Sequence, residues 1–139
     1  MGSFQEIEHT ADYALLLRGV DLRDLLQAAG DGFLALVTDE SRPAPNRWAQ
    51  YHVSAEDGAL LVRRAITELL YYLEDGDLPV AFQALAVTED PPAASLRVGL
   101  VPLSEAGDHL HRHVKAVTYH DLQLRRDDQG LSLILTLDT

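Results

Sequence analysis

The last segment of the chain alternates leucine with other residues in a strict period of two. Leucine occupies every second position from Leu131 to Leu137, and the positions between them run from Ser132 to Asp138. Successive side chains of a strand point to opposite faces, so this period predicts a strand with one face in the core. We expect the strand to span 131–137 after a turn at 127–130, with Asp138 at the end of its other face.

Residues 22–37 instead carry apolar side chains at the three- and four-residue spacing of a helix. Asp21 is the expected N-cap, with Asp24 three residues later. Gly30 and Gly32 inside the helix each cost about 1 kcal/mol relative to alanine. These two glycines would permit a close backbone approach, which the sequence alone does not decide.

A second apolar stripe predicts a helix that begins at Ser54, with Asp57 in a capping-box-like position, and ends at Gly76. Residues 104–109 are expected to form a loop. The remaining apolar segments are expected to be strands, and they are 4–8, 13–18, 47–53, 80–87, 95–101 and 114–126.

This order of helices and strands predicts an α+β fold, with two helices packed on one face of a mostly antiparallel sheet. At 139 residues the chain has the length of a single domain, 1–139. No apolar stretch reaches the roughly 18–20 residues of a membrane span, and the N-terminus lacks the features of a signal peptide. A cytoplasmic protein with no membrane association is expected.

The charge balance restricts the partners of the chain. It has 22 acidic and 11 basic residues, a net charge of −11, and Lys115 is its only lysine. Such a surface repels phosphate, so we expect little or no direct RNA binding and an attraction to cations or a basic protein. Because cysteine is absent, a metal would be held by oxygen and imidazole ligands.

The sequence lacks the common catalytic motifs. It has no glycine-rich phosphate-binding loop, no GxSxG nucleophile elbow and no HExxH zinc motif. The remaining chemical groups are carboxylates and histidines near the ends of the expected elements. His9 and Asp12 flank the first turn, where turn-stabilising hydrogen bonds explain them equally well. Asp39 follows the first helix, at the negative end of its dipole, where a cation would relieve the repulsion.

The geometry of the last hairpin predicts the neighbours of Asp138. A turn centred on Asp128 and Gln129 places Tyr119 opposite Asp138, with Lys115 on the same face. A frayed C-terminus would leave Asp138 without that role.

Histidines form a second candidate group. His109, His111 and His113 alternate, which would suit a metal clip in an extended strand, although a solvated loop explains them as well. His120 alternates with leucines and is expected to be a core histidine with a hydrogen-bond partner.

Five short motifs, in this order along nearly the whole chain, resemble the archease family. They are EHTAD at 8–12, VTD at 37–39, ELLY at 68–71, VKAVTYH at 114–120 and the terminal LD at 137–138. The resemblance implies the SHS2-like archease fold. It also implies a cofactor protein, not itself an enzyme, for an RtcB-type RNA ligase that uses GTP and manganese in tRNA splicing and RNA repair.

On this resemblance, the chain would promote guanylylation of the ligase and its multiple turnover, and would meet GTP only through the ligase. The family's acidic metal site corresponds to Asp12, Asp39 and Asp138. Lys115 corresponds to the functional lysine, in the catalytic role. Three further residues would lie next to this site, namely His9, Tyr119 and His120.

Oxygen ligands suit Ca²⁺, Mn²⁺ or Mg²⁺. Two other functions remain open at this point. The same carboxylates would serve a metal-dependent phosphohydrolase, with Lys115 holding phosphate. Alternatively, the carboxylates would form only the docking face of a chaperone-like modulator of an RNA-modifying enzyme.

Overall fold

A computed structural model of the chain describes residues 2–8, 12–120 and 122–139. Its first sheet has five antiparallel strands: β1 (Ser3–Glu8), β2 (Asp12–Gly19), β8 (Gly130–Asp138), β6 (Ala116–Val117) and β7 (Arg125–Asp127). The order is β1-β2-β8-β6, and β7 also pairs with β8. The β8 strand therefore lies inside the sheet, with neighbours along both edges.

The second sheet has three antiparallel strands: β3 (Arg47–Ser54), β4 (Asp77–Glu89) and β5 (Pro92–Pro102). Its order is β3-β5-β4, which leaves β3 and β4 as its two edges. The prediction of a single sheet is wrong, because the two groups of strands do not share a hydrogen-bonded ladder. The α+β class and the antiparallel pairing are confirmed.

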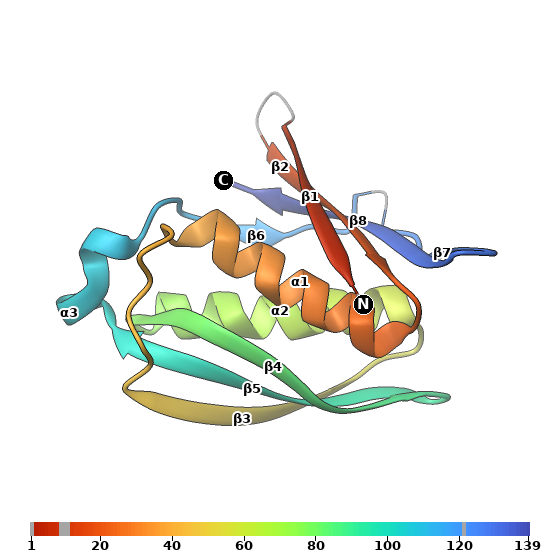
Figure 1. Cartoon of the computed structure of the whole chain (residues 1–139), viewed down its shortest axis with the longest axis horizontal. Helices are drawn as coiled ribbons and strands as arrows, with labels where there is room; N and C mark the ends of the chain where they lie inside the picture. The colour runs from red at the N-terminus through yellow and green to blue at the C-terminus, as the bar shows by residue number, and fades with distance from the viewer. Residues whose placement is uncertain (1, 9–11, 121) are drawn as a thin grey trace.

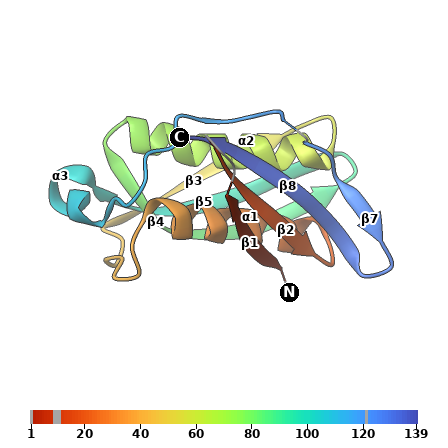
Figure 2. The same ribbon diagram turned by 90° about the horizontal axis from the view of Figure 1, so that it is seen from above.

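The two long helices, α1 (Leu22–Val37) and α2 (Gly58–Glu74), lie between the two sheets (Figure 1). Each of them contacts strands of both sheets. The short helix α3 (Leu103–Ala106) and the 3₁₀ turn η1 (Gly107–His109) replace the predicted loop. They lie at the opposite end of the molecule from the β7–β8 hairpin (Figure 2). No helix in the described part of the chain has both the length and the apolar character needed to cross a membrane.

Local rules explain where the long helices begin. Asp21 caps α1 as predicted, since its Oδ1 accepts a hydrogen bond of 2.9 Å from the backbone N–H of Asp24. The second helix begins later than predicted, at Gly58 and not at Ser54. Asp57 is its N-cap, and its Oδ1 accepts a bond of 2.9 Å from Leu60 N–H. Ser54 completes β3, and Ala55 N–H still donates to Pro92 O at 3.1 Å, so the sheet takes the residues of the first predicted turn of helix.

The core combines the apolar stripe of each helix with the inward faces of both sheets. The alternating leucines of β8 are buried as the sequence predicts, with exposures of 0–3%. Tyr51 of β3 is also buried, and its hydroxyl donates a hydrogen bond of 2.8 Å to the backbone oxygen of Ala65 in α2. Burial raises the pKa of Tyr51 above its ordinary value.

Gly30 lies on the buried side of α1 against the ring of Phe82 in β4, a close approach that the missing Cβ permits. Gly30→Ala is expected to destabilise the protein although alanine favours a helix over glycine by about 1 kcal/mol. The new Cβ would overlap the Phe82 ring, and overpacking of this kind costs about 1–3 kcal/mol. The urea midpoint of unfolding should fall.

Gly107→Ala is the matched control, because no described atom beyond its neighbours in the chain lies within 4 Å of the Cβ that it would add. Its midpoint should stay near that of the wild type. A Gly30→Ala midpoint equal to or above the wild-type value would contradict the close packing of Phe82 on α1.

Candidate metal site at the end of β8

Backbone pairing gathers three of the predicted site residues around the end of β8. The Cα of Asp138 is paired with that of Asp12 in β2 and, on its other side, with that of Ala116 in β6. Lys115 donates its backbone N–H to the carbonyl oxygen of Asp138 at 2.7 Å. Only the backbone of Asp12 is described here.

The predicted pairing of Tyr119 with Asp138 is wrong. The register near the turn is as predicted, since Arg125 pairs with Ser132. The predicted strand at 114–126 is interrupted between β6 and β7, however, and Ala116 takes the place opposite Asp138. Tyr119 follows the end of β6 and has no Cα partner in β8. Its side chain is 65% exposed, and its ring centroid lies 3.7 Å from Cζ of Arg63.

Asp39 follows α1 and is tied to a distant histidine. Its Oδ1 accepts hydrogen bonds from His109 Nδ1 at 3.0 Å and from the backbone and hydroxyl of Ser41 at 3.1 and 3.0 Å. The bond from His109 is the main reason why the pKa of Asp39 lies below its ordinary value. All three contacts use Oδ1, so within the described part of the chain Oδ2 of Asp39 has no protein partner.

One segment connects Asp39 with the end of β8. It begins where Asp39 N–H donates to His109 O at 3.1 Å and Thr38 forms a bridge with Leu110. It ends where Lys115 bonds to Asp138. The segment thus has one end at Asp39 and the other at Asp138. No spacing in the sequence indicates the contact between Asp39 and His109, which only the tertiary structure reveals.

The histidines do not form the clip that alternation allowed. His109 lies in η1, whereas His111 and His113 are exposed. His120 is exposed as well, so the prediction of a core histidine is wrong; its backbone N–H donates to Thr118 Oγ1 at 3.2 Å. His9 lies outside the described residues.

The described residues contain no group of three or more acidic or histidine side chains that could hold a metal ion. The described residues include neither His9 nor the side chain of Asp12. Carboxylate oxygens, the donors that aspartate offers, suit hard divalent cations. Lys115 is exposed, and within the described part of the chain no carboxylate forms an ion pair with it.

Comparison with known proteins gives a consistent family. The sequence model of the Archease protein family (MTH1598/TM1083) matches residues 4–139. A relative named "Protein archease" from Methanopyrus kandleri is 31% identical over 90% of this chain and 91% of its own length. Another from Aeropyrum pernix is 27% identical over 91% of this chain and 90% of its own length.

Two solved structures share the fold. The solution structure of Methanobacterium thermoautotrophicum protein 1598 has a TM-score of 0.78 at 22% identity, covering 99% of both chains. A Thermotoga maritima crystal structure described as "an archease, possible chaperone" has a TM-score of 0.68 at 19% identity. It covers 97% of this chain and 96% of that one.

The Asp39–His109 contact predicts a pH dependence. The folded-state pKa of Asp39 is lowered, so the contact stabilises the fold above the ordinary carboxyl pKa, and this stabilisation is lost as the pH falls through the lower value. His109→Ala should raise the pKa of Asp39 toward that of an ordinary carboxyl group. Carbon-13 NMR titration of the Asp39 carboxyl group measures this.

Ser41→Ala is the matched variant and should raise the pKa of Asp39 by less, because its hydroxyl bond contributes less than that of His109. An Asp39 titration that is unchanged in His109→Ala would contradict the hydrogen bond between these two side chains.

Proposed function

This chain belongs to the archease family, and we propose that it is a metal-binding cofactor protein that activates an RtcB-type RNA ligase. The family match confirms the resemblance that the short motifs indicate. In the proposed role the chain joins no RNA itself. It promotes guanylylation and multiple turnover of a ligase that acts in tRNA splicing and RNA repair.

The observation that carries the proposal is the pairing of Asp12 with Asp138, next to the bond from Lys115 to Asp138. This pairing brings together, at one end of the first sheet, the EHTAD motif, the terminal LD motif and the motif that contains the only lysine. This juxtaposition is what a functional site built from these motifs requires, and it depends on residues far apart in the sequence.

In the proposed site, Asp12, Asp39 and Asp138 hold a divalent cation, Ca²⁺, Mn²⁺ or Mg²⁺. Oδ2 of Asp39 supports this role, because the described protein partners of that carboxylate all use its other oxygen. A cation would offset the repulsion among the carboxylates and present positive charge to a phosphate group.

The ligase is proposed as the partner from the family resemblance, and the net charge of −11 fits a partner with a basic surface. Such a charge favours a basic protein over free RNA, and electrostatic steering would speed the encounter with a ligase whose active site binds phosphates. GTP would then be bound by the ligase and not by this chain.

Asp138→Asn is expected to weaken binding of Mn²⁺ and Ca²⁺ at least about tenfold, which is the smallest effect typical even of residues that only support metal ligands. The amide keeps the backbone pairing of β8 and removes the charge. Isothermal titration calorimetry measures the affinity, and Asp128→Asn, at an exposed turn position, is the control. Equal affinity in all three proteins would reject Asp138 as a ligand.

Lys115→Arg is expected to lower ligase activation although the charge is retained. An ammonium is a compact point charge, whereas a guanidinium is a wide planar fork, and the backbone bond to Asp138 is the same in both. The rate of ligase guanylylation measures the effect. An undiminished rate would leave Lys115 as a surface residue without this role.

The central experiment measures guanylylation of the cognate ligase with GTP and Mn²⁺, with substoichiometric amounts of this protein, over a range of salt concentrations. Acceleration is expected, and it should weaken as salt screens the steering. Asp138→Asn should abolish most of it.

Each failure points elsewhere. Acceleration that survives in Asp138→Asn would favour the chaperone-like modulator, in which the carboxylates hold no metal. Hydrolysis of a nucleotide by this protein alone would favour the phosphohydrolase. No acceleration of the cognate ligase would reject the activator.

A further inference from the structure

The backbone groups along the two edges of the three-stranded sheet differ in how far other parts of the chain shield them, and this difference points to a binding surface. Along β4, side chains of α1 bond the backbone. Arg23 donates to Ala84 O at 3.0 Å, and Gln27 donates to Phe82 O at 3.0 Å and accepts from Ala84 N–H at 2.9 Å. The strand also contains Pro79 and two register shifts, features that discourage pairing with another strand.

Apart from its last residue, Ser54, the β3 edge has none of these protections among the described residues. It is eight residues long, lacks proline and pairs with β5 without a register shift. The bond from Ala55 N–H to Pro92 O identifies the hydrogen-bonded pairs, so every second residue before Ala55 faces β5. The N–H and C=O groups of Trp48, Gln50 and His52 therefore point away from the sheet.

Only the end of this edge is bonded from outside the sheet within the described part of the chain. There, Ser54 O accepts a hydrogen bond from Arg64 Nη1, as the alternation requires. In Figure 1, β3 lies along the margin of the molecule with no element beyond it. Strand edges of this kind are usually shielded, because their backbone groups are a template for another strand.

A hollow of about 340 Å³ opens beside the end of β3, between this strand and α2, and Arg63, Arg64 and Glu68 are among the residues that line it. Arg63 is held in place by its Nε bond of 3.0 Å to Val117 O and by Tyr119. Two guanidinium groups against one carboxylate make this a cationic hollow on a protein of net charge −11.

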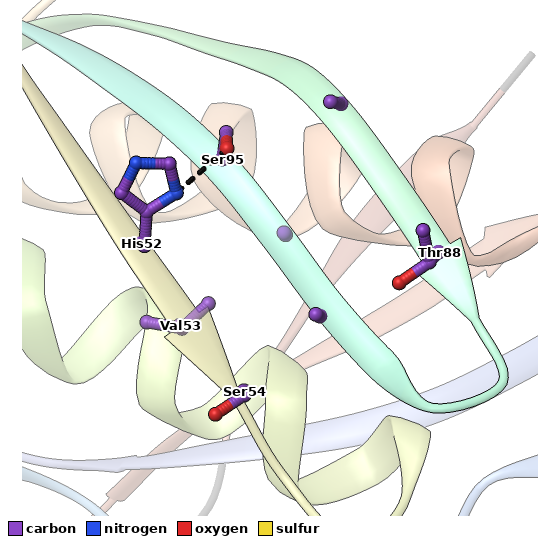
Figure 3. Close-up of a pocket in the computed structure, with 8 residues that line it drawn as sticks. His52, Val53, Ser54, Thr88 and Ser95 are labelled. Atoms are coloured by element: carbon purple, nitrogen blue, oxygen red, sulfur yellow. Dashed lines mark hydrogen bonds between the residues drawn. The ribbon is translucent and has the colours of Figure 1, made fainter.

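A second hollow, of about 310 Å³, lies on the outer face of the sheet beside the same end of β3 (Figure 3). Its polar side chains include His52 and Ser95, whose Nδ1 and Oγ lie 2.7 Å apart. This second hollow extends over β5 and β4, away from the open edge, so only the cationic hollow borders the place of a strand added beside β3.

We propose that β3 is a docking edge for an extended segment of a partner protein. The segment would continue the sheet through the backbone of Trp48, Gln50 and His52 and place an acidic side chain against Arg63 and Arg64. Backbone bonds give such strand addition its affinity, and here the cationic hollow between β3 and α2 would give it specificity. A second copy of this chain is the less suitable occupant, because two chains of −11 repel each other. The proposal is independent of the metal site and of the ligase.

Amide hydrogen exchange of the free protein is the first test. The amides of Trp48, Gln50 and His52 should exchange much faster than those of Ala49, Tyr51 and Val53, which face β5. Equal protection of the two sets would show that the edge is already occupied and would overturn the proposal.

The second test uses a capped eight-residue peptide of alternating valine and threonine with one central glutamate. It should slow exchange at Trp48, Gln50 and His52 and change the fluorescence of Trp48, the only tryptophan. The same peptide with glutamine should bind several-fold more weakly, because the charge opposite the arginines is lost. A peptide methylated at alternate backbone nitrogens should not bind, since its donors are blocked.

Variants separate the two parts of the proposal. Gln50→Pro removes only an outward N–H and should weaken binding about tenfold or more, with Gln50→Ala as the control. Arg64→Gln should remove the preference for glutamate over glutamine, whereas Arg18→Gln, on the other sheet, should not. Circular dichroism and urea unfolding check the fold of each variant.

Three results would overturn the proposal. They are no effect of millimolar glutamate peptide on the β3 amides, peptide-induced changes confined to another surface, and a dimer in sedimentation experiments that Gln50→Pro converts to monomer. In the last case the edge would be occupied by a second copy.

Discussion

The pairing of β8 on both of its edges is the constraint on which the candidate site depends. One face of β8 is apolar enough to lie in the core, and its hydrogen bonds run along β2 on one side and to β6 and β7 on the other. The strand is therefore held at its sides as well as against the helices. Its end, Asp138, is fixed beside Asp12 and Ala116 and is not left as a free terminus.

The proposed site combines two aspartates in paired strands with a third that follows a helix. Asp12 and Asp138 belong to paired strands, which hold their backbones in register. Asp39 instead follows a helix and is joined to the strands through His109 and the segment that leads to Lys115. Among its described contacts the Asp39 carboxylate is held by one oxygen only, which leaves the other for the cation that we propose.

Local patterns were sufficient for some elements and not for others. The bounds of α1 and the cap at Asp21 follow from spacing and backbone hydrogen bonding within one segment. The prediction of one continuous strand at 114–126 was wrong, because alternation within a segment does not show where that segment stops pairing with its neighbour. Once that stretch leaves β8, Tyr119 and His120 become exposed, and Ala116 takes the place opposite Asp138.

The sequence by itself determined the α+β class, the core face of β8, the net charge and the motif residues of the candidate site. These depend on periodicity, composition and short motifs, which are properties of neighbouring residues. Only the tertiary structure decided that the strands form two sheets and that His109 bonds Asp39. It also decided that side chains of α1 bond the backbone of β4, whereas among the described residues the outer edge of β3 is bonded only at Ser54. Each of these depends on contacts between residues far apart in the chain, and no local pattern encodes which distant backbone or side chain will supply the partner.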